Sequence, residues 1–205
     1  MKKVLSLLFA LVLVVSCAGV SMPAKAEGEG EEVTSLALNY SNVPFSNEYT
    51  GFCIDHSKSG AGENNNKTNE DGNPTNKFIS VSTAEAKSNK DESDISQKLK
   101  MMFITFFEEL FTYSNGEYKV RNANTILSVV WKYSDNINIS GEALNLWERV
   151  ESCEPIEIPD HGYQIRVGND IITFHFAVMK AKNAAIQDFF AYKLDVAPAN
   201  ASPTS

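Results

Sequence analysis

The spacing of hydrophobic positions along the chain changes twice, from strand-like to helix-like and back. Near the start, apolar residues alternate with polar ones, which predicts a half-buried strand over residues 33–40. Short runs rich in aromatic and β-branched residues predict two further strands, over 48–54 and 77–82. The first part of the chain is therefore expected to contribute to a sheet.

In the middle of the chain, apolar residues recur at steps of three and four, which is the period of an α-helix. This pattern predicts helices over residues 93–113, 121–133 and 141–152. The first of them has a broad apolar face rich in phenylalanine, which we interpret as a core-facing surface. The members of that face are Ile95, Leu99, Met102, Phe103, Phe106, Phe107 and Leu110.

The last part of the chain returns to alternation of period two. Residues 162–167 and 170–179 predict a hairpin with Gly168-Asn169 at its turn, and residues 186–196 predict a final strand. Strands, then helices, then strands indicate a single α+β domain. We expect a small antiparallel sheet or barrel-like part joined to a helical subdomain.

The two ends of the chain have the composition of segments outside the folded domain. A basic start and an almost wholly apolar run lead to Ala24-Lys25-Ala26, so residues 1–26 are predicted to be a secretory signal peptide. The alternative is a lipobox ending at Cys17, which would make the protein a lipoprotein. Residues 27–32 are expected to be a disordered linker, and residues 197–205 a linker or a truncated C-terminal segment. The protein is thus expected to be secreted or attached to the cell surface.

Charge excludes two classes of partner. The 205-residue chain has a net charge of −8, and loss of the three lysines that precede residue 27 would make it −11. A chain of this charge repels nucleic acid and anionic membranes. The sequence also has no second long apolar segment, so we expect no membrane insertion after removal of the signal.

Two cysteines remain after the signal segment, Cys53 and Cys153. Export permits a disulfide between them, and we hold a Cys53–Cys153 bond as a hypothesis. Two cysteines do not make a disulfide scaffold in a domain of this size. The hydrophobic core must therefore supply most of the stability.

Two short segments show a recognisable order of residue types: Phe52-Cys53-Ile54-Asp55 and Ile126-Leu127-Ser128-Val129-Val130-Trp131. The first is aromatic-Cys-apolar-polar, and the second is an apolar segment closed by tryptophan. Together they resemble the two signature segments of Gram-positive bacterial surface thioester domains, the TQxA family, with Phe52 and Trp131 as supporting positions. The resemblance covers residues 33–196. It implies an adhesin that attaches to a host or extracellular-matrix protein and that acts without a cofactor and not as an enzyme.

In that family a cysteine thiol and a glutamine side chain condense, lose ammonia and form an internal thioester. An amine on the partner opens this electrophile and forms an amide. Cys53 occupies the cysteine position, whereas Leu127 occupies the glutamine position and offers no carbonyl. The resemblance implies that residue 127 faces the Cys53 strand. We therefore expect a degenerate domain that binds its ligand without covalent capture.

One alternative keeps the covalent chemistry. The residues around Gln187 repeat the order apolar-Gln-polar-apolar-apolar, although Ala191 replaces the tryptophan. An active thioester adhesin would then use Cys53 and Gln187 and form an amide with a host amine. The other interpretation of Gln187 is a surface residue on an edge strand.

A second alternative is a cysteine-dependent extracellular enzyme. Cys53 would be the nucleophile, a histidine its base and an aspartate the orienting group. The candidates for these two roles are His56, His161, His175, Asp55 and Asp160. No metal site is predicted, because Cys53-x-x-His56 supplies at most half of a zinc site.

The segment from Asp55 to Asn76 is polar, rich in glycine and asparagine, and without periodicity. These features predict a long surface loop. Long loops inside compact domains are often functional. We therefore take this loop as the candidate recognition surface.

Overall fold

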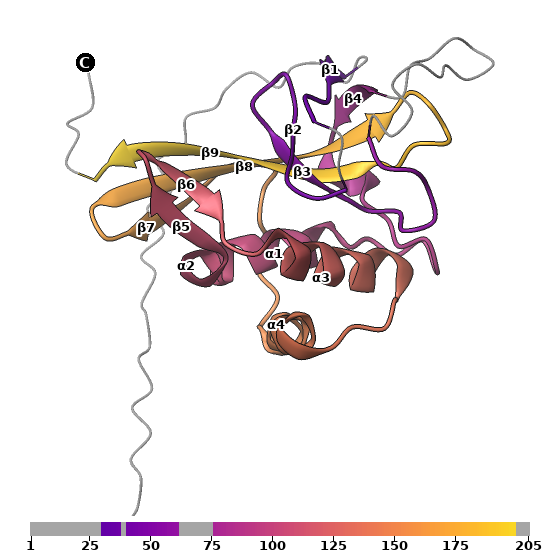
Figure 1. The fold of residues 1–205 in the computed structure, drawn as a ribbon. Helices are drawn as coiled ribbons and strands as arrows, with labels where there is room; N and C mark the ends of the chain where they lie inside the picture. Colours follow the sequence, from indigo (N-terminus) through magenta and orange to yellow (C-terminus); the bar gives the residue numbers. More distant parts are fainter. Residues whose placement is uncertain (1–29, 38–39, 62–75, 200–205) are drawn as a thin grey trace, which may run out of the picture.

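The computed structural model describes residues 30–37, 40–61 and 76–199. It shows a curled antiparallel sheet that lies on a layer of helices, which confirms the α+β class (Figure 1). The predicted signal segment 1–26, with Cys17, lies outside the described residues. The segments 62–75 and 200–205 also lie outside them.

The main sheet has seven strands in the order β1-β4-β8-β9-β3-β2, and β7 pairs with β8 on the same side as β4. Its long central pair is β8 and β9, which spans the molecule (Figure 1). The strands are β1 (Glu32–Thr34), β2 (Val43–Pro44), β3 (Thr50–Cys53), β4 (Lys77–Val81), β7 (His161–Val167), β8 (Asp170–Ala181) and β9 (Phe189–Pro198).

The helices all come from the middle of the chain and cover one face of the sheet (Figure 1). Helix α3 packs against β3, and α4 lies on the far side of α3 from the sheet. A separate two-stranded hairpin joins α2 to α3. The elements are η1 (Thr83–Glu85), α1 (Ser96–Thr105), α2 (Phe107–Leu110), β5 (Phe111–Ser114), β6 (Glu117–Val120), α3 (Ala123–Asp135) and α4 (Gly141–Ser152).

Where β3 pairs with β9 and β9 with the second half of β8, the sheet is buried on both faces, since successive side chains of a strand point to opposite sides. On the helix face, Phe52 of β3 lies 5.9 Å from the Phe103 ring of α1, measured between ring centroids. On the other face, which we call the curl face, Phe189 of β9 packs on Phe45 and Phe78 at 5.5 Å each. The core therefore has two parts separated by β3, β8 and β9.

The prediction of one helix over residues 93–113 is wrong. Helix α1 ends at Thr105, α2 forms a single turn, and the chain enters β5 at Phe111. Phe106 interrupts the helix with φ −108° and ψ 25°. The Asn115-Gly116 turn, with positive φ at both residues, then closes the β5–β6 hairpin. An Asn-Gly pair between aromatic and β-branched residues is a hairpin signal, so the sequence offered a reason to end the helix earlier.

The boundaries of β1 and β9 also differ from the prediction. Of the strand expected over 33–40, Val33 and Thr34 pair with β4 as part of β1, and residues 38 and 39 lie outside the described residues. Glu32 belongs to β1, and the Glu31 carbonyl accepts a hydrogen bond from the Ser80 amide. The expected linker 27–32 is thus partly sheet. Strand β9 begins at Phe189 and continues through Ala197 into the expected C-terminal linker, because it pairs with the turn end of β8.

A buried ion pair connects the helix layer to the start of β7. The ammonium of Lys100 on α1, whose side chain is only 3% exposed, lies 2.6 Å from a carboxylate oxygen of Asp160. It also donates to the Ile158 carbonyl at 2.8 Å. Asp160 accepts further hydrogen bonds from Thr83 and Ser82 beside η1. This cluster joins three segments that are far apart in sequence.

Acid is expected to weaken this connection. Burial alone would raise the pKa of Asp160, but hydrogen bonds from Lys100 and Thr83 outweigh it and lower the pKa from 3.8 to about 2. The pKa of Asp160 is lower in the folded protein than in the unfolded chain. Its charged form therefore contributes fully to the free energy of unfolding above the unfolded-state pKa, and this contribution is lost as the pH falls through the folded-state pKa. A pKa shift of this size corresponds to roughly 2 kcal/mol in the free energy of unfolding.

Urea unfolding of the wild type and of Asp160→Asn at several pH values between about 5 and 2 tests this expectation. The difference in unfolding free energy between the two proteins should shrink across that interval, since only the wild type can lose the charged form of Asp160. If the difference in unfolding free energy between the two proteins stays constant over this pH interval, the lowered pKa of Asp160 is contradicted.

Candidate functional site

Cys53 is the last residue of β3 and is fully buried. It stands opposite Phe189 of β9, and its backbone amide donates to the Tyr40 carbonyl. Burial raises the pKa of the Cys53 thiol far above its usual value, and the nearby Asp55 charge raises it further. The thiol is therefore protonated at neutral pH, which makes it a poor nucleophile.

The register of β3 decides which way the Cys53 side chain points. Residues directly opposite each other in an antiparallel pair share a face, so Cys53 lies on the curl face with Phe189. A Cβ atom on Gly51, two residues earlier, would meet Phe45 and Phe189 on that same face. Phe52, between them, points to the helix layer.

Leu127 lies on α3, in the helix layer, and is 8% exposed. Helix α3 does pack against β3, as the resemblance implies. However, the alternation of β3 directs the Cys53 thiol to the opposite face of the sheet. Helix α3, which carries Leu127, thus packs against the Cys53 strand, whereas the thiol itself lies on the other face of that strand.

Trp131, one turn after Leu127, contacts the segment that follows Cys53. Its ring centroid lies 4.5 Å from that of His56 and 6.3 Å from that of Tyr40. Asp135 on the same helix accepts a hydrogen bond from the His56 amide at 3.0 Å. The motif tryptophan thus fastens the end of β3 to α3, which is a structural role.

Gln187 is fully buried, so its interpretation as a surface residue is wrong. It precedes β9 by two residues, and its side-chain amide donates to the Lys58 carbonyl. Its carbonyl oxygen is buried and has no hydrogen-bond partner among the described residues. Gln187 lies before the start of β9, and the pairing of β3 with β9 ends at Cys53 and Phe189, two residues after Gln187.

Cys53 and Cys153 are free thiols in the structure, so the hypothesised disulfide is absent. Cys153 follows α4, which lies beyond α3 as seen from the sheet (Figure 1). Its sulfur donates instead to the Arg149 carbonyl at 3.3 Å. A layer of helix separates the two cysteines, and a disulfide requires Cα atoms within about 7 Å.

The histidines do not form a catalytic group with Cys53 in the described contacts. His56 packs on Trp131. His161 and His175 lie next to each other on β7 and β8, with ring centroids 5.7 Å apart, and His175 pairs with Asp195 at 2.9 Å. Burial and the neighbouring His175 lower the pKa of His161.

The two candidate orienting aspartates are engaged elsewhere. Asp55 accepts hydrogen bonds from Ser57 and pairs with Lys58 at 3.0 Å. Asp160 belongs to the Lys100 cluster. Within residues 30–37, 40–61 and 76–199, no group of three or more His, Cys, Asp or Glu side chains is placed to hold a metal ion.

The described start of the predicted recognition loop is packed against the domain. Asp55 is buried, Ser59 forms a bridge to Ile186, and Gly60 and Ala61 are buried. The remainder of the loop, residues 62–75, lies outside the described residues. His56, Ser57 and Lys58 between these residues are exposed, so the described start of the loop keeps some surface open to a ligand.

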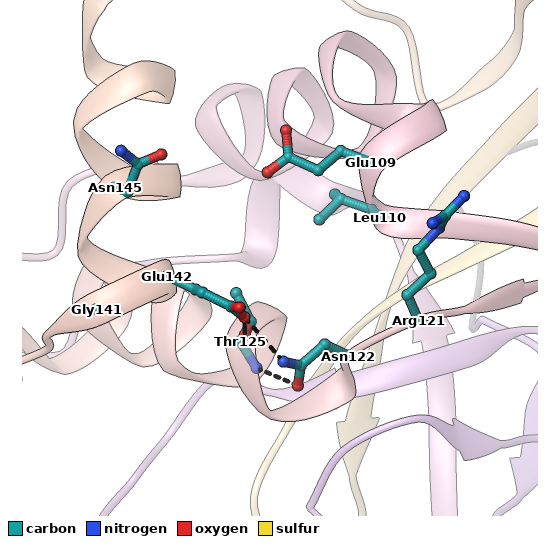
Figure 2. A pocket seen from close by; sticks show the side chains of 8 residues that line it. All are labelled: Glu109, Leu110, Arg121, Asn122, Thr125, Gly141, Glu142 and Asn145. Atoms are coloured by element: carbon teal, nitrogen blue, oxygen red, sulfur yellow. Dashed lines mark hydrogen bonds between the residues drawn. The ribbon is translucent and has the colours of Figure 1, made fainter.

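An open cleft of about 570 Å³ lies where α2, α3 and α4 approach one another (Figure 2). It is lined by Glu109, Leu110, Arg121, Asn122, Thr125, Gly141, Glu142 and Asn145. These residues come from the end of α2 and from the beginnings of α3 and α4. Sequence reasoning missed the cleft, because none of its segments contains a motif and only the packing of the helices brings them together.

The hydrogen bonds of the cleft fix some of its polar groups and leave others unused. A carboxylate oxygen of Glu142 accepts from the Asn122 amide at 3.2 Å and from the Thr125 hydroxyl at 3.4 Å (Figure 2). Arg121 donates through Nε to the Phe111 carbonyl at 2.7 Å. Among the described residues, Glu142 has no cationic partner and the terminal nitrogens of Arg121 have no acidic partner.

Comparison with known proteins does not assign the chain to a family: no family model, no curated protein and no solved structure matches it. None of the helices in the described part of the chain is long and apolar enough to cross a membrane.

Proposed function

We propose that this protein is a secreted or cell-surface bacterial adhesin-like domain that binds a host or extracellular-matrix protein without covalent capture. The observation that carries the proposal is the contrast between a buried, protonated Cys53 thiol and an open cleft beside α3. A thiol in that state cannot act on a partner, whereas the cleft is accessible to one.

One further feature supports the resemblance on which the proposal draws, and a second supports its non-covalent part. The Trp131 segment packs on the end of the Cys53 strand, so the two motif segments are neighbours in space. The hydrocarbon side chain of Leu127 is almost fully buried and cannot supply the carbonyl of a thioester. A domain that keeps both segments without the reactive pair is consistent with a scaffold used for reversible binding.

The experiment that tests this function is binding of the purified domain to immobilised matrix proteins and to cultured host cells. We expect binding that a denaturing wash removes completely and that Cys53→Ala leaves unchanged. A complex that survives denaturing electrophoresis would contradict the non-covalent part of the proposal. Absence of binding across the panel would contradict the adhesin role.

A second candidate function is favoured by the burial of Gln187. This residue lies two positions before Phe189, which pairs with Cys53, and its carbonyl oxygen is buried and lacks a partner among the described residues. Condensation would join Sγ of Cys53 to the side-chain carbonyl carbon of Gln187 and release ammonia. The domain would then be an active thioester adhesin that forms an amide with a host amine.

The mass of the native protein distinguishes the two candidates. We expect neither the wild type nor Leu127→Gln to lose ammonia, because the thiol is protonated and faces away from α3. Mass spectrometry of the peptide that contains Cys53, with and without methylamine, makes this measurement. A loss of one ammonia that methylamine shifts, and that Gln187→Ala and Cys53→Ala both abolish, would establish the second candidate instead.

A further inference from the structure

We infer that the cleft in Figure 2 binds an extended peptide segment that carries one basic and one acidic side chain. The inference rests on the proposed function, since it names the part of a protein partner that this surface recognises. The volume of the cleft, about 570 Å³, lies within the usual range of ligand sites.

The two opposite charges of the cleft are both available to a ligand. Glu109 is already paired with Arg149 at 2.8 Å, so its charge is compensated. Glu142 accepts hydrogen bonds from the neutral groups of Asn122 and Thr125, and no cation among the described residues pairs with it. A cationic side chain of a ligand would supply the missing partner of this carboxylate.

Arg121 supplies the complementary positive charge. Its Nε atom donates to the Phe111 carbonyl, which orients the guanidinium, and its terminal nitrogens have no acidic partner among the described residues. Figure 2 shows Arg121 on the opposite side of the cleft from Glu142 and Asn145, with Leu110 between them. A ligand that meets both charges carries a basic and an acidic group on the two sides of Leu110, which a peptide segment with one side chain of each kind supplies.

The acidic side of the cleft is preorganised by the beginning of α3. The Asn122 side chain caps this helix by accepting from the Thr125 amide at 3.2 Å, and its amide nitrogen donates to Glu142. The same residues therefore fix the helix end and the carboxylate. Groups held in place before binding lose little conformational freedom when the ligand arrives, which improves affinity.

A peptide array tests the inference. The probes are capped hexapeptides of alanine and leucine that contain one lysine and one glutamate at every pair of positions, with lysine-only, glutamate-only and neutral sets for comparison. The wild type should bind peptides with both charges about tenfold more tightly than peptides with one, because each charge-assisted hydrogen bond contributes about that factor.

Substitutions at the two charges should separate their roles. Glu142→Gln should weaken binding of the lysine-containing sets by about tenfold and leave the glutamate-only set unchanged, and Arg121→Gln should do the reverse. Matched controls are Glu85→Gln and Lys180→Gln, which remove an exposed pair outside the cleft lining. If thermal melting shows that Arg121→Gln disturbs the fold, Arg121→Lys replaces it, since a lysine keeps the charge but loses the paired donors.

The inference is overturned if the array shows no preference for the doubly charged set, or if Glu142→Gln leaves the lysine preference intact. Binding to an oligosaccharide array that Arg121→Gln abolishes would also overturn it, in favour of a saccharide site. The proposed function can fail separately: adhesion that survives Glu142→Gln and Arg121→Gln keeps the adhesin role and removes only the cleft from it.

Discussion

Asp160→Asn is expected to lower the free energy of unfolding by about 3–5 kcal/mol at neutral pH. Lys100 lies almost wholly inside the protein, and its ammonium pairs with Asp160 at 2.6 Å. The asparagine amide can still accept from Thr83 and Ser82, but it cannot balance a buried positive charge. Removal of one partner of a buried ion pair has a cost of this size, since the other charge stays desolvated.

Urea unfolding at pH 7 measures the change, and two further variants sharpen it. Glu85→Gln removes an ion pair in which both side chains are about half exposed, and it should change the unfolding free energy by less than about 1 kcal/mol. The double variant Lys100→Met/Asp160→Asn should be more stable than Asp160→Asn, because no unpaired charge remains. If Asp160→Asn lowers the free energy of unfolding as little as Glu85→Gln does, the Lys100–Asp160 cluster contributes little to stability.

Phe103→Ala is the second substitution with a large expected effect, also about 3–5 kcal/mol. Phe103 is fully buried on α1 and is the aromatic residue through which α1 reaches the helix face of the sheet. Its ring centroid lies between 5.0 and 6.3 Å from those of Phe52, Phe111, Phe176, Phe190 and Tyr192. Truncation would leave a cavity that rings from β3, β5, β8 and β9 cannot all close.

Chemical denaturation provides the measurement, and Tyr113→Ala provides the control. Tyr113 is 59% exposed on β5 and packs mainly on Tyr118, so its loss should cost less than about 1 kcal/mol. Equal losses for the two variants would mean that α1 is not anchored to the sheet as described. A loss for Phe103→Ala accompanied by a lower denaturant dependence would indicate that the packing between helices and sheet fails before the sheet itself.

The sequence by itself determined the elements whose signals are local. The hairpin of β7 and β8 follows from period-two alternation on both sides of Gly168-Asn169, and α4 follows from its helical spacing of apolar residues. The burial of Phe174 and Phe176 on one face of β8 was predictable for the same reason. These patterns belong to a few consecutive residues, so they do not depend on what the rest of the chain does.

Tertiary structure decided the features that depend on pairing between distant segments. The spacing of apolar residues continued through Phe111, but the pairing of β5 with β6 ended the helix earlier. The motif order placed Leu127 near Cys53, but the register of β3 against β9 sends the thiol to the other face. Gln187 is buried because the chain after Asp55 folds over it, and the cleft exists only where three helices meet. Side-chain direction in a sheet reverses with a shift of one residue, so motif spacing alone could not determine which groups face each other.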